Sequence, residues 1–318
     1  MNNPSSDKFN PINSLKLFSL DEQFNTFISL YKNQNLPKVI LLTGEKGIGK
    51  FTLMFHFINY IFSLNSEYPY NHDDLIINEN SPFYKRIIIN TEQNFNYIGS
   101  SKPSPATIED IRNMKKKFSK SPLNNQPRFT ILDDVELLNI NAANALLKLI
   151  EEPSIYDYFI LINNKKKKMI ETLHSRSIEV KIFLESEQKN LTFNLLKNNF
   201  EIENNYFAKF IKFTTPGMLI RYLSLFEELK IKNEDNFYDI ITKSLHQFKK
   251  SKNTLSLDAI NFLLDIKFYQ LTMEKNAKVL EILEIKNKLT NLFYQYRNFN
   301  LNSDTVFNQF KLYSNYVR

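Results

Sequence analysis

The chain has 318 residues, contains no cysteine and carries a formal net charge of +7 at pH 7. Its length predicts two or three domains, and the lack of cysteine excludes disulfides, cysteine-ligated zinc and thiol catalysis. No apolar run reaches the roughly 18 residues of a membrane span, and the polar N-terminus has no secretory segment, so we expect a cytoplasmic protein. The basic balance is compatible with nucleic acid nearby, but lysine and asparagine are abundant along the whole chain, as in proteins of AT-rich genomes, which weakens this argument.

Apolar side chains at helical spacing predict a first helix over residues 21–32. Residues 38–43 then form a short apolar run, typical of a buried parallel strand, and residues 44–50 read Gly-Glu-Lys-Gly-Ile-Gly-Lys. An apolar helix is predicted over residues 51–62. A strand, a glycine loop and a helix in this order predict a phosphate-binding loop, because the N-terminus of the helix directs a partial positive charge at a phosphate.

The residues of this loop have separate tasks. It contains three glycines, Gly44, Gly47 and Gly49, which let backbone N–H groups surround phosphate oxygens. Lys50 reaches the outer phosphates, and the next residue normally carries a hydroxyl that binds Mg²⁺. That residue is Phe51, which has no oxygen, and Thr52 lies about 100° farther around the helix axis. The loop is therefore expected to hold a nucleotide and to be poorly equipped to hydrolyse it.

Residues 64–106 are expected to be mainly loop, with short β-like runs at 75–77 and 86–89. A helix is predicted over residues 107–118. Thr107 can serve as its N-cap, and Asp110, three residues later, can complete a capping box.

A second motif follows, in which an apolar strand from Phe129 ends in Asp133 and Asp134. Asp133 occupies the Walker B position, where the acid holds Mg²⁺ through water. Active ATPases normally have glutamate next, but Asp134 is shorter by one methylene, roughly 1.5 Å of reach. A base displaced that far loses much of its positioning, so this motif also predicts weak hydrolysis.

A helix from residue 141 is expected to end before Pro153, and a further buried strand is predicted over residues 158–163. The strand ends in Asn163 and Asn164. An amide at this edge could sense the outer phosphate of a nucleotide, whereas an asparagine pair is also common in plain turns. The sequence leaves both interpretations open.

A run of four lysines, Lys165–Lys168, favours a solvated turn over a DNA contact. Arg176 precedes a strand predicted over residues 178–182, after which strand patterns stop. Helices are expected over residues 185–199, 203–213 and 217–229, and then near 236–249, 257–274, 277–296 and 303–317. The predicted domains are therefore a base over residues 1–185, a small helical lid over 186–233 and an all-helical domain over 234–318.

The order of these motifs resembles the AAA+ clamp-loader family. The resemblance is carried mainly by residues 131–153, in which an acidic pair is followed by Ala-Asn-Ala-Leu-Leu-Lys and Glu-Glu-Pro, and by Ser175-Arg176-Ser177. It implies an α/β AAA+ P-loop domain with a parallel five-stranded sheet, a helical lid and an all-α collar domain. Leu36-Pro37 and the turn at His72 resemble the delta-prime branch of the family rather than its motor subunits.

The resemblance also implies a function. It implies a stator subunit of the bacterial sliding-clamp loader, within the DNA polymerase III holoenzyme, in a hetero-pentamer with motor and delta subunits that places the clamp on primed DNA. Arg176 would act as an arginine finger in trans in a neighbour's ATPase site. ATP or ADP would bind at the P-loop without productive Mg²⁺. The four-cysteine zinc module of many relatives is missing, and Met218 stands where motor relatives bring a lid arginine.

Two alternatives stay open. The chain could be an active ATPase motor of the clamp loader, with Thr52 and Asp134 serving Mg²⁺ and water after a local shift. It could also be a DNA-remodelling AAA+ protein unrelated to the clamp. The sequence does not determine whether nucleotide is bound.

Overall fold

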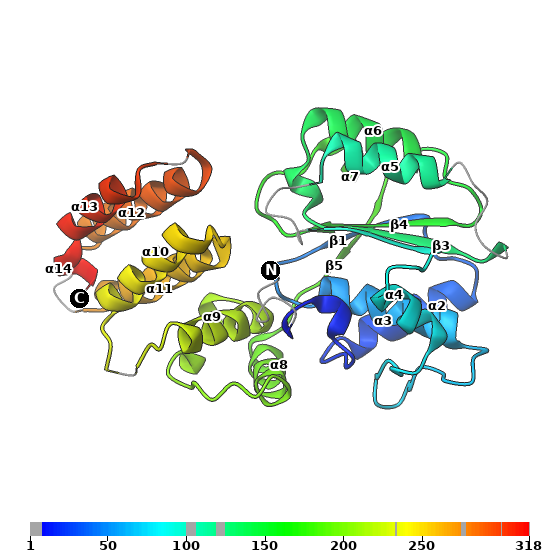
Figure 1. The fold of residues 1–318 in the computed structure, drawn as a ribbon, viewed down its shortest axis with the longest axis horizontal. Coiled ribbons are helices and arrows are strands. Elements are labelled where there is room, and N and C mark those ends of the chain that lie inside the picture. The colour runs from blue at the N-terminus through cyan, green and yellow to red at the C-terminus, as the bar shows by residue number, and fades with distance from the viewer. Residues whose placement is uncertain are drawn as a thin grey trace. The chain divides into compact units, whose positions relative to one another are not determined.

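The computed structural model describes residues 8–99, 106–118, 125–232, 234–274, 278–299 and 301–317. The chain divides into two compact units, Met1–Gln188 and Lys189–Arg318 (Figure 1). The predicted base domain over residues 1–185 stays a prediction. The predicted boundary between lid and collar falls at residue 233, which lies outside the described residues, and it stays a prediction.

The first unit is built on a five-stranded parallel sheet with the order β2-β3-β4-β1-β5. The strands are β1 (Val39–Thr43), β2 (Phe95–Ile98), β3 (Arg128–Leu132), β4 (Asp157–Asn163) and β5 (Ile178–Lys181). All residues of β1 and β3 are buried, which explains their near-continuous apolar sequences. The predicted α/β class and the five-stranded sheet are therefore confirmed.

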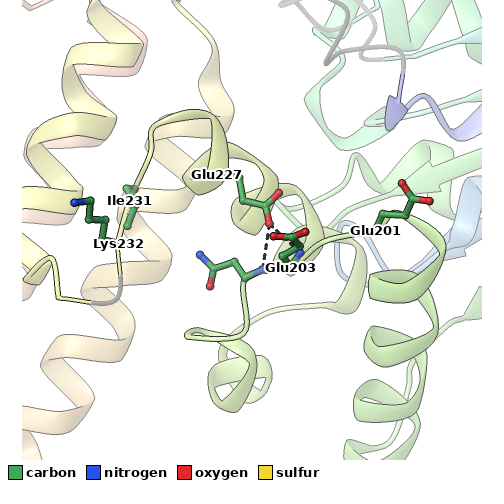
Figure 2. A pocket seen from close by; sticks show the side chains of 6 residues that line it. Glu201, Glu203, Glu227, Ile231 and Lys232 are labelled. Carbon is green, nitrogen blue, oxygen red and sulfur yellow. Dashed lines mark hydrogen bonds between the residues drawn. The ribbon is translucent and has the colours of Figure 1, made fainter.

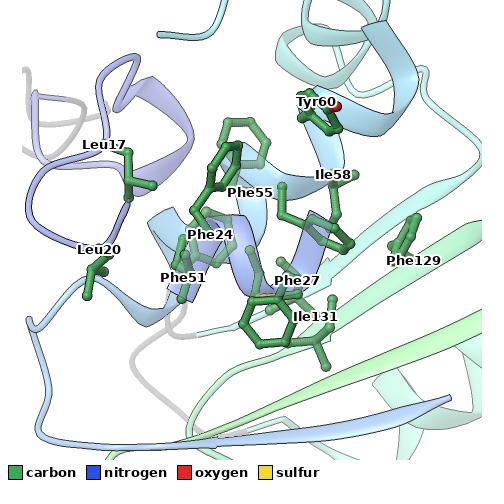
Figure 3. Close-up of a cluster of buried hydrophobic side chains, with 14 of the residues drawn as sticks. Leu17, Leu20, Phe24, Phe27, Phe51, Phe55, Ile58, Tyr60, Phe129 and Ile131 are labelled. Atoms are coloured by element: carbon green, nitrogen blue, oxygen red, sulfur yellow. The ribbon is translucent and has the colours of Figure 1, made fainter. Parts of the chain in front are cut away.

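Helices cover both faces of this sheet (Figure 1). One face carries α2 (Asp21–Lys32), α3 (Lys50–Ser63) and α4 (Pro82–Ile88), and the other carries α5 (Ile108–Phe118), α6 (Ile140–Ile150) and α7 (Glu171–His174). Each face has its own cluster of buried apolar side chains. The cluster under α2 and α3 is rich in phenylalanine and includes Phe24, Phe51 and Phe55 (Figure 3).

Two predictions in the region 64–106 are wrong, and part of that region, residues 100–105, lies outside the described residues. Residues 86–88, expected as a β-like run, belong to α4, because Pro82 at the first turn favours a helix start and Ile87 is buried while Ile89 is exposed. Strand β2 lies where loop was expected, since four residues are too few to show a clear strand pattern in the sequence.

The amino ends of β3 and β4 are joined by a buried ion pair. Arg128 and Asp157 are register partners, and the guanidinium donates from Nε and Nη2 to the two carboxylate oxygens at 2.8 and 3.0 Å. A third nitrogen, Nη1, donates to the carbonyl of Lys117 at 3.1 Å, and the ring of Phe118 lies 4.0 Å from the guanidinium carbon. Every charged group of this pair is thus satisfied within the protein.

In the second unit, the described regular elements are all helices. It contains α8 (Ser186–Asn199, which begins in the first unit), the 3₁₀ helix η4 (Ala208–Phe213), α9 (Pro216–Glu228), α10 (Phe237–Ser251), α11 (Thr254–Thr272), α12 (Val279–Phe299), α13 (Ser303–Leu312) and α14 (Ser314–Val317). The helix predicted over 203–213 is confirmed only in its second half.

Asn236, Asn253 and Asn302 cap α10, α11 and α13 through their side-chain oxygens. Among the described residues, no helix is both long and apolar enough to cross a bilayer.

Candidate functional site

The phosphate loop connects β1 to α3 at the carboxyl edge of the sheet, the edge where open parallel sheets bind ligands. Gly47 and Gly49 have φ values of 81° and 101°, a region that other residues rarely adopt. A Cβ on Gly44 would lie 2.4 Å from the carbonyl oxygen of Ile182, so no side chain fits there. The glycines therefore place the backbone and the N-terminus of α3 as a phosphate site requires.

Lys50 lies inside this loop and is 3% exposed. Its ammonium donates to the carbonyl oxygens of Gly44 and Glu45 at 2.7 and 2.8 Å. Burial lowers the pKa of Lys50 to about 8, although the charges of Asp133 and Glu136 act in the opposite direction. A buried ammonium whose hydrogen bonds go to carbonyl oxygens would gain from a directly bonded anion, and phosphate oxygens can supply one.

Phe51 points into the core and not toward the phosphate loop. Its ring stacks on Phe55 at 5.6 Å between centroids and meets the edge of the Tyr97 ring at 4.6 Å, and only 7% of the residue is exposed. Figure 3 shows Phe51 and Phe55 within the cluster of buried side chains. The position that normally offers a hydroxyl to Mg²⁺ is thus part of the hydrophobic packing. The neighbouring Thr52 is half-buried.

The two Walker B acids follow β3, and both accept a hydrogen bond from the side-chain amide of Asn164. The Asp133 carboxylate accepts hydrogen bonds from the backbone N–H of Asp134 and from the side-chain amide of Asn164, both at 2.8 Å. The Asp134 carboxylate accepts from the same amide at 2.7 Å and from the Lys166 ammonium at 2.8 Å. Asp134 itself has a left-handed backbone, with φ of 56°.

These contacts separate the pKa values of the two acids. Burial and the adjacent Asp134 charge raise the pKa of Asp133 above its usual value. Burial acts on Asp134 as well, but the hydrogen bond and charge of Lys166, together with the Asn164 amide, outweigh it and lower the pKa of Asp134. Asp134 is therefore a charged carboxylate that already has a cationic partner.

The asparagine that meets these acids is Asn164, whereas the residue predicted for the site was Asn163. The Asn163 side chain accepts from the backbone N–H of Lys165 at 2.8 Å and stabilises the turn. Glu136, which is buried, accepts from the N–H groups of Asn164 and Lys166 at 3.2 and 3.3 Å. Sequence reasoning did not assign Lys166 to the site, and the only signal for it was the lysine run itself.

Arg176 lies between α7 and β5, and its hydrogen bonds go to Glu151 and Thr172 and not to the phosphate loop. Its Nε donates to Glu151 at 2.9 Å, its Nη1 donates to the carbonyl of Thr172 at 3.2 Å, and 40% of the side chain is exposed. It is accessible to another molecule. Met218, in α9 of the second unit, is buried.

The donor set fits phosphate better than a divalent metal. Phe51 offers no oxygen, and the Asp134 carboxylate is already occupied by Lys166 and Asn164. In the described part of the chain, no three acidic or histidine side chains are grouped as metal ligands would be. A shallow pocket of the second unit carries Glu201, Glu203 and Glu227, but Glu227 accepts from the backbone N–H groups of Glu203 and Asn204 and so serves the turn (Figure 2).

Comparison with known proteins identifies the family. The family model described as "DNA polymerase III, delta subunit" matches residues 20–185, slightly more than half of the chain. The chain belongs to this family. Its sheet order and phosphate loop form an α/β AAA+ fold, followed by a helical C-terminal region, as the resemblance implied.

Relatives named as delta' and gamma subunits of DNA polymerase III also match the chain. The delta' subunit of DNA polymerase III from Buchnera aphidicola subsp. Schizaphis graminum is 27% identical over 242 residues, covering 75% of this chain and 69% of the relative. The gamma subunit from the same organism is 29% identical over 171 residues, covering 49% of this chain and 46% of the relative. Among solved structures, a gamma subunit-related protein from Thermotoga maritima has a TM-score of 0.49 and 17% identity, and the match covers 89% of this chain and 96% of that one.

Proposed function

We propose that the chain is a delta-prime-like stator subunit of the clamp loader of DNA polymerase III, which does not hydrolyse nucleotide in its own site. The observation that carries the proposal is the position of Phe51, whose ring is fixed between Phe55 and Tyr97. Without a hydroxyl there, Mg²⁺ lacks a protein ligand, and the geometry of phosphoryl transfer depends on that metal. The pairing of Asp134 with Lys166 supports the same conclusion, because it removes the second acid as a base.

The stator would act on a motor subunit through Arg176. An arginine supplied in trans stabilises the charge of the transferring phosphoryl group and raises rates by about 10³–10⁵ in other NTPases. Arg176 is half-exposed, and its pairing with Glu151 is a surface ion pair, which costs little to open. A subunit of this kind would bind motor and delta subunits, the sliding clamp and, through the complex, primed DNA.

The first test is ATP turnover by the purified chain. We expect turnover at the level of the buffer control, and we expect Phe51→Thr alone to leave it there, because Asp134 stays paired. Robust turnover that Lys50→Ala abolishes would overturn the proposal and favour a motor subunit. That alternative is kept because the chain also matches relatives named gamma.

The second test concerns Arg176 in a clamp loader reconstituted with motor subunits. Arg176→Ala should lower the ATPase rate stimulated by clamp and DNA, while size-exclusion chromatography shows an intact complex. Arg112→Ala is the matched control, because Arg112 is also exposed and ion-paired, to Glu109, but precedes no strand at the site edge. An unchanged rate with Arg176→Ala would remove the finger, and failure to assemble with motor subunits would remove the stator role.

A further inference from the structure

At the carboxyl edge of the sheet, the ammonium group of Lys166 lies beside the acids that hold the metal in an active ATPase. Lys166 Nζ lies 2.8 Å from the Asp134 carboxylate, whose side chain is 5% exposed, while the lysine side chain is 28% exposed. The Asn164 amide donates to both acids at 2.7 and 2.8 Å. Both Walker B carboxylates therefore already have donors from the chain.

The turn that carries Lys166 is held in place by buried groups. Glu136 accepts from two of its backbone N–H groups, and Asn163 accepts from a third. Lys165 has a φ of 58°, which turns the chain sharply between Asn164 and Lys166. Because the backbone of the turn is fixed, the ammonium is delivered to Asp134 without further ordering of the main chain.

Charge balance argues against a divalent ion beside this ammonium. In an ordinary site the acids face one lysine of the loop, and Mg²⁺ supplies the missing positive charge. Here Asp134 interacts with Lys166 and with Lys46, and Lys50 interacts with Asp133, Asp134 and Glu136. A divalent metal at Asp134 would either displace Lys166 or be repelled by its positive charge. Phe51 has no oxygen that could bind the metal and offset this cost.

We propose that Lys166 takes the place of the divalent metal, so that the phosphate loop binds a nucleoside diphosphate or triphosphate without Mg²⁺. The inference rests on the proposed non-hydrolysing site and adds the residue that determines its metal requirement. Lys50 and the N-terminus of α3 hold the phosphates, while Lys166 keeps the acids from repelling them.

The test is the dissociation constant of ADP for the full chain, measured by isothermal titration calorimetry in excess Mg²⁺ and in EDTA. We expect the two constants to agree within about threefold in the wild type. Lys166→Met keeps the length of the side chain but removes its charge, and should make binding about tenfold weaker in EDTA than in Mg²⁺. Lys168→Met is the matched control, because Lys168 belongs to the same run but pairs with the exposed Glu171, and it should behave as the wild type.

A second readout counts the metal directly. Electron paramagnetic resonance with Mn²⁺ and ADP should show no bound metal in the wild type and bound metal in Lys166→Met. Lys166→Gln, which can still donate to Asp134, serves as the variant if Lys166→Met does not fold. Wild-type binding that needs Mg²⁺, no ADP binding under either condition, or variants identical to the wild type would each overturn the inference. Because ADP is not hydrolysed, these outcomes leave the stator proposal standing, whereas ATP turnover tests that proposal separately.

Discussion

Strands β3 and β4 carry an ion pair at each end, and the two pairs differ in how completely the protein encloses them. At the amino end, Arg128 and Asp157 are register partners within the strands, with side chains 5% and 7% exposed. At the carboxyl end, Asp134 and Lys166 lie on turns, and the lysine side chain is 28% exposed. The guanidinium makes two parallel contacts to its acid, whereas the ammonium makes one.

The difference shows which of the two ion pairs is more accessible to solvent. The bidentate pair joins two register partners of the sheet and is almost completely buried, so it serves the fold. The carboxyl-end pair is held by side chains on turns, and the Lys166 side chain is more exposed than either member of the amino-end pair. We therefore propose that similar charges serve the fold at one end of the strands and nucleotide binding at the other.

The largest expected effect comes from breaking the amino-end pair. Asp157→Ala leaves the buried Arg128 guanidinium without its carboxylate, which should cost about 3–5 kcal/mol of unfolding free energy in urea denaturation. The double variant Arg128→Met/Asp157→Leu, which replaces both charges by apolar groups, should recover most of the loss. A single variant as stable as the wild type would contradict the structural role of this pair.

The next effect concerns pH and Lys50 at the carboxyl end. The pKa of Lys50 is about 8 in the folded chain, against 10.5 for an ordinary lysine. Between these values the unfolded chain binds the additional proton, so unfolding becomes less favourable as pH rises from about 8 to about 10.5. Measured against Lys50→Met, the wild type should gain about 3 kcal/mol across this window. Equal pH profiles for the two proteins would show that folding does not lower the pKa of Lys50.

The smallest effect is expected from Lys166→Met. Water reaches the lysine and Asn164 still donates to Asp134, so the loss of unfolding free energy should be about 1 kcal/mol in the same urea assay. Lys168→Met, which removes an exposed pair, should change stability by about 0.5 kcal/mol or less. If Lys166→Met and Asp157→Ala lowered the unfolding free energy equally, the two ion pairs would be equally shielded from water.

Local patterns accounted for much of the first unit. The predicted capping box is present, since the N–H of Thr107 donates to Asp110 and the N–H of Asp110 donates back to the Thr107 hydroxyl. The helix at 21–32 and the strand ending at Thr43 were also located correctly. These features depend on residues a few positions apart, so a single sequence contains the information.

Features that depend on distant residues were missed. Whether the isoleucines at 87–89 form a strand or a helix depends on which of them the core buries. The edge strand β2 is defined mainly by its pairing with β3. The contact of Asn164 with Asp133 and Asp134 depends on the turn after β4, which a local pattern does not define. The assignment of Asn163 to nucleotide binding stays a prediction.

The sequence by itself determined the phosphate loop, the acidic pair and the replacement of a metal-binding hydroxyl by Phe51, because each is a matter of residue type at a fixed spacing. Only the tertiary structure decided that the Phe51 ring packs into the core and that Lys166 meets Asp134. The contacts of Phe51 with Tyr97 and of Lys166 with Asp134 join segments that are far apart in the chain. They depend on the order of strands in the sheet and on the turn after β4, which brings the ammonium to the acid.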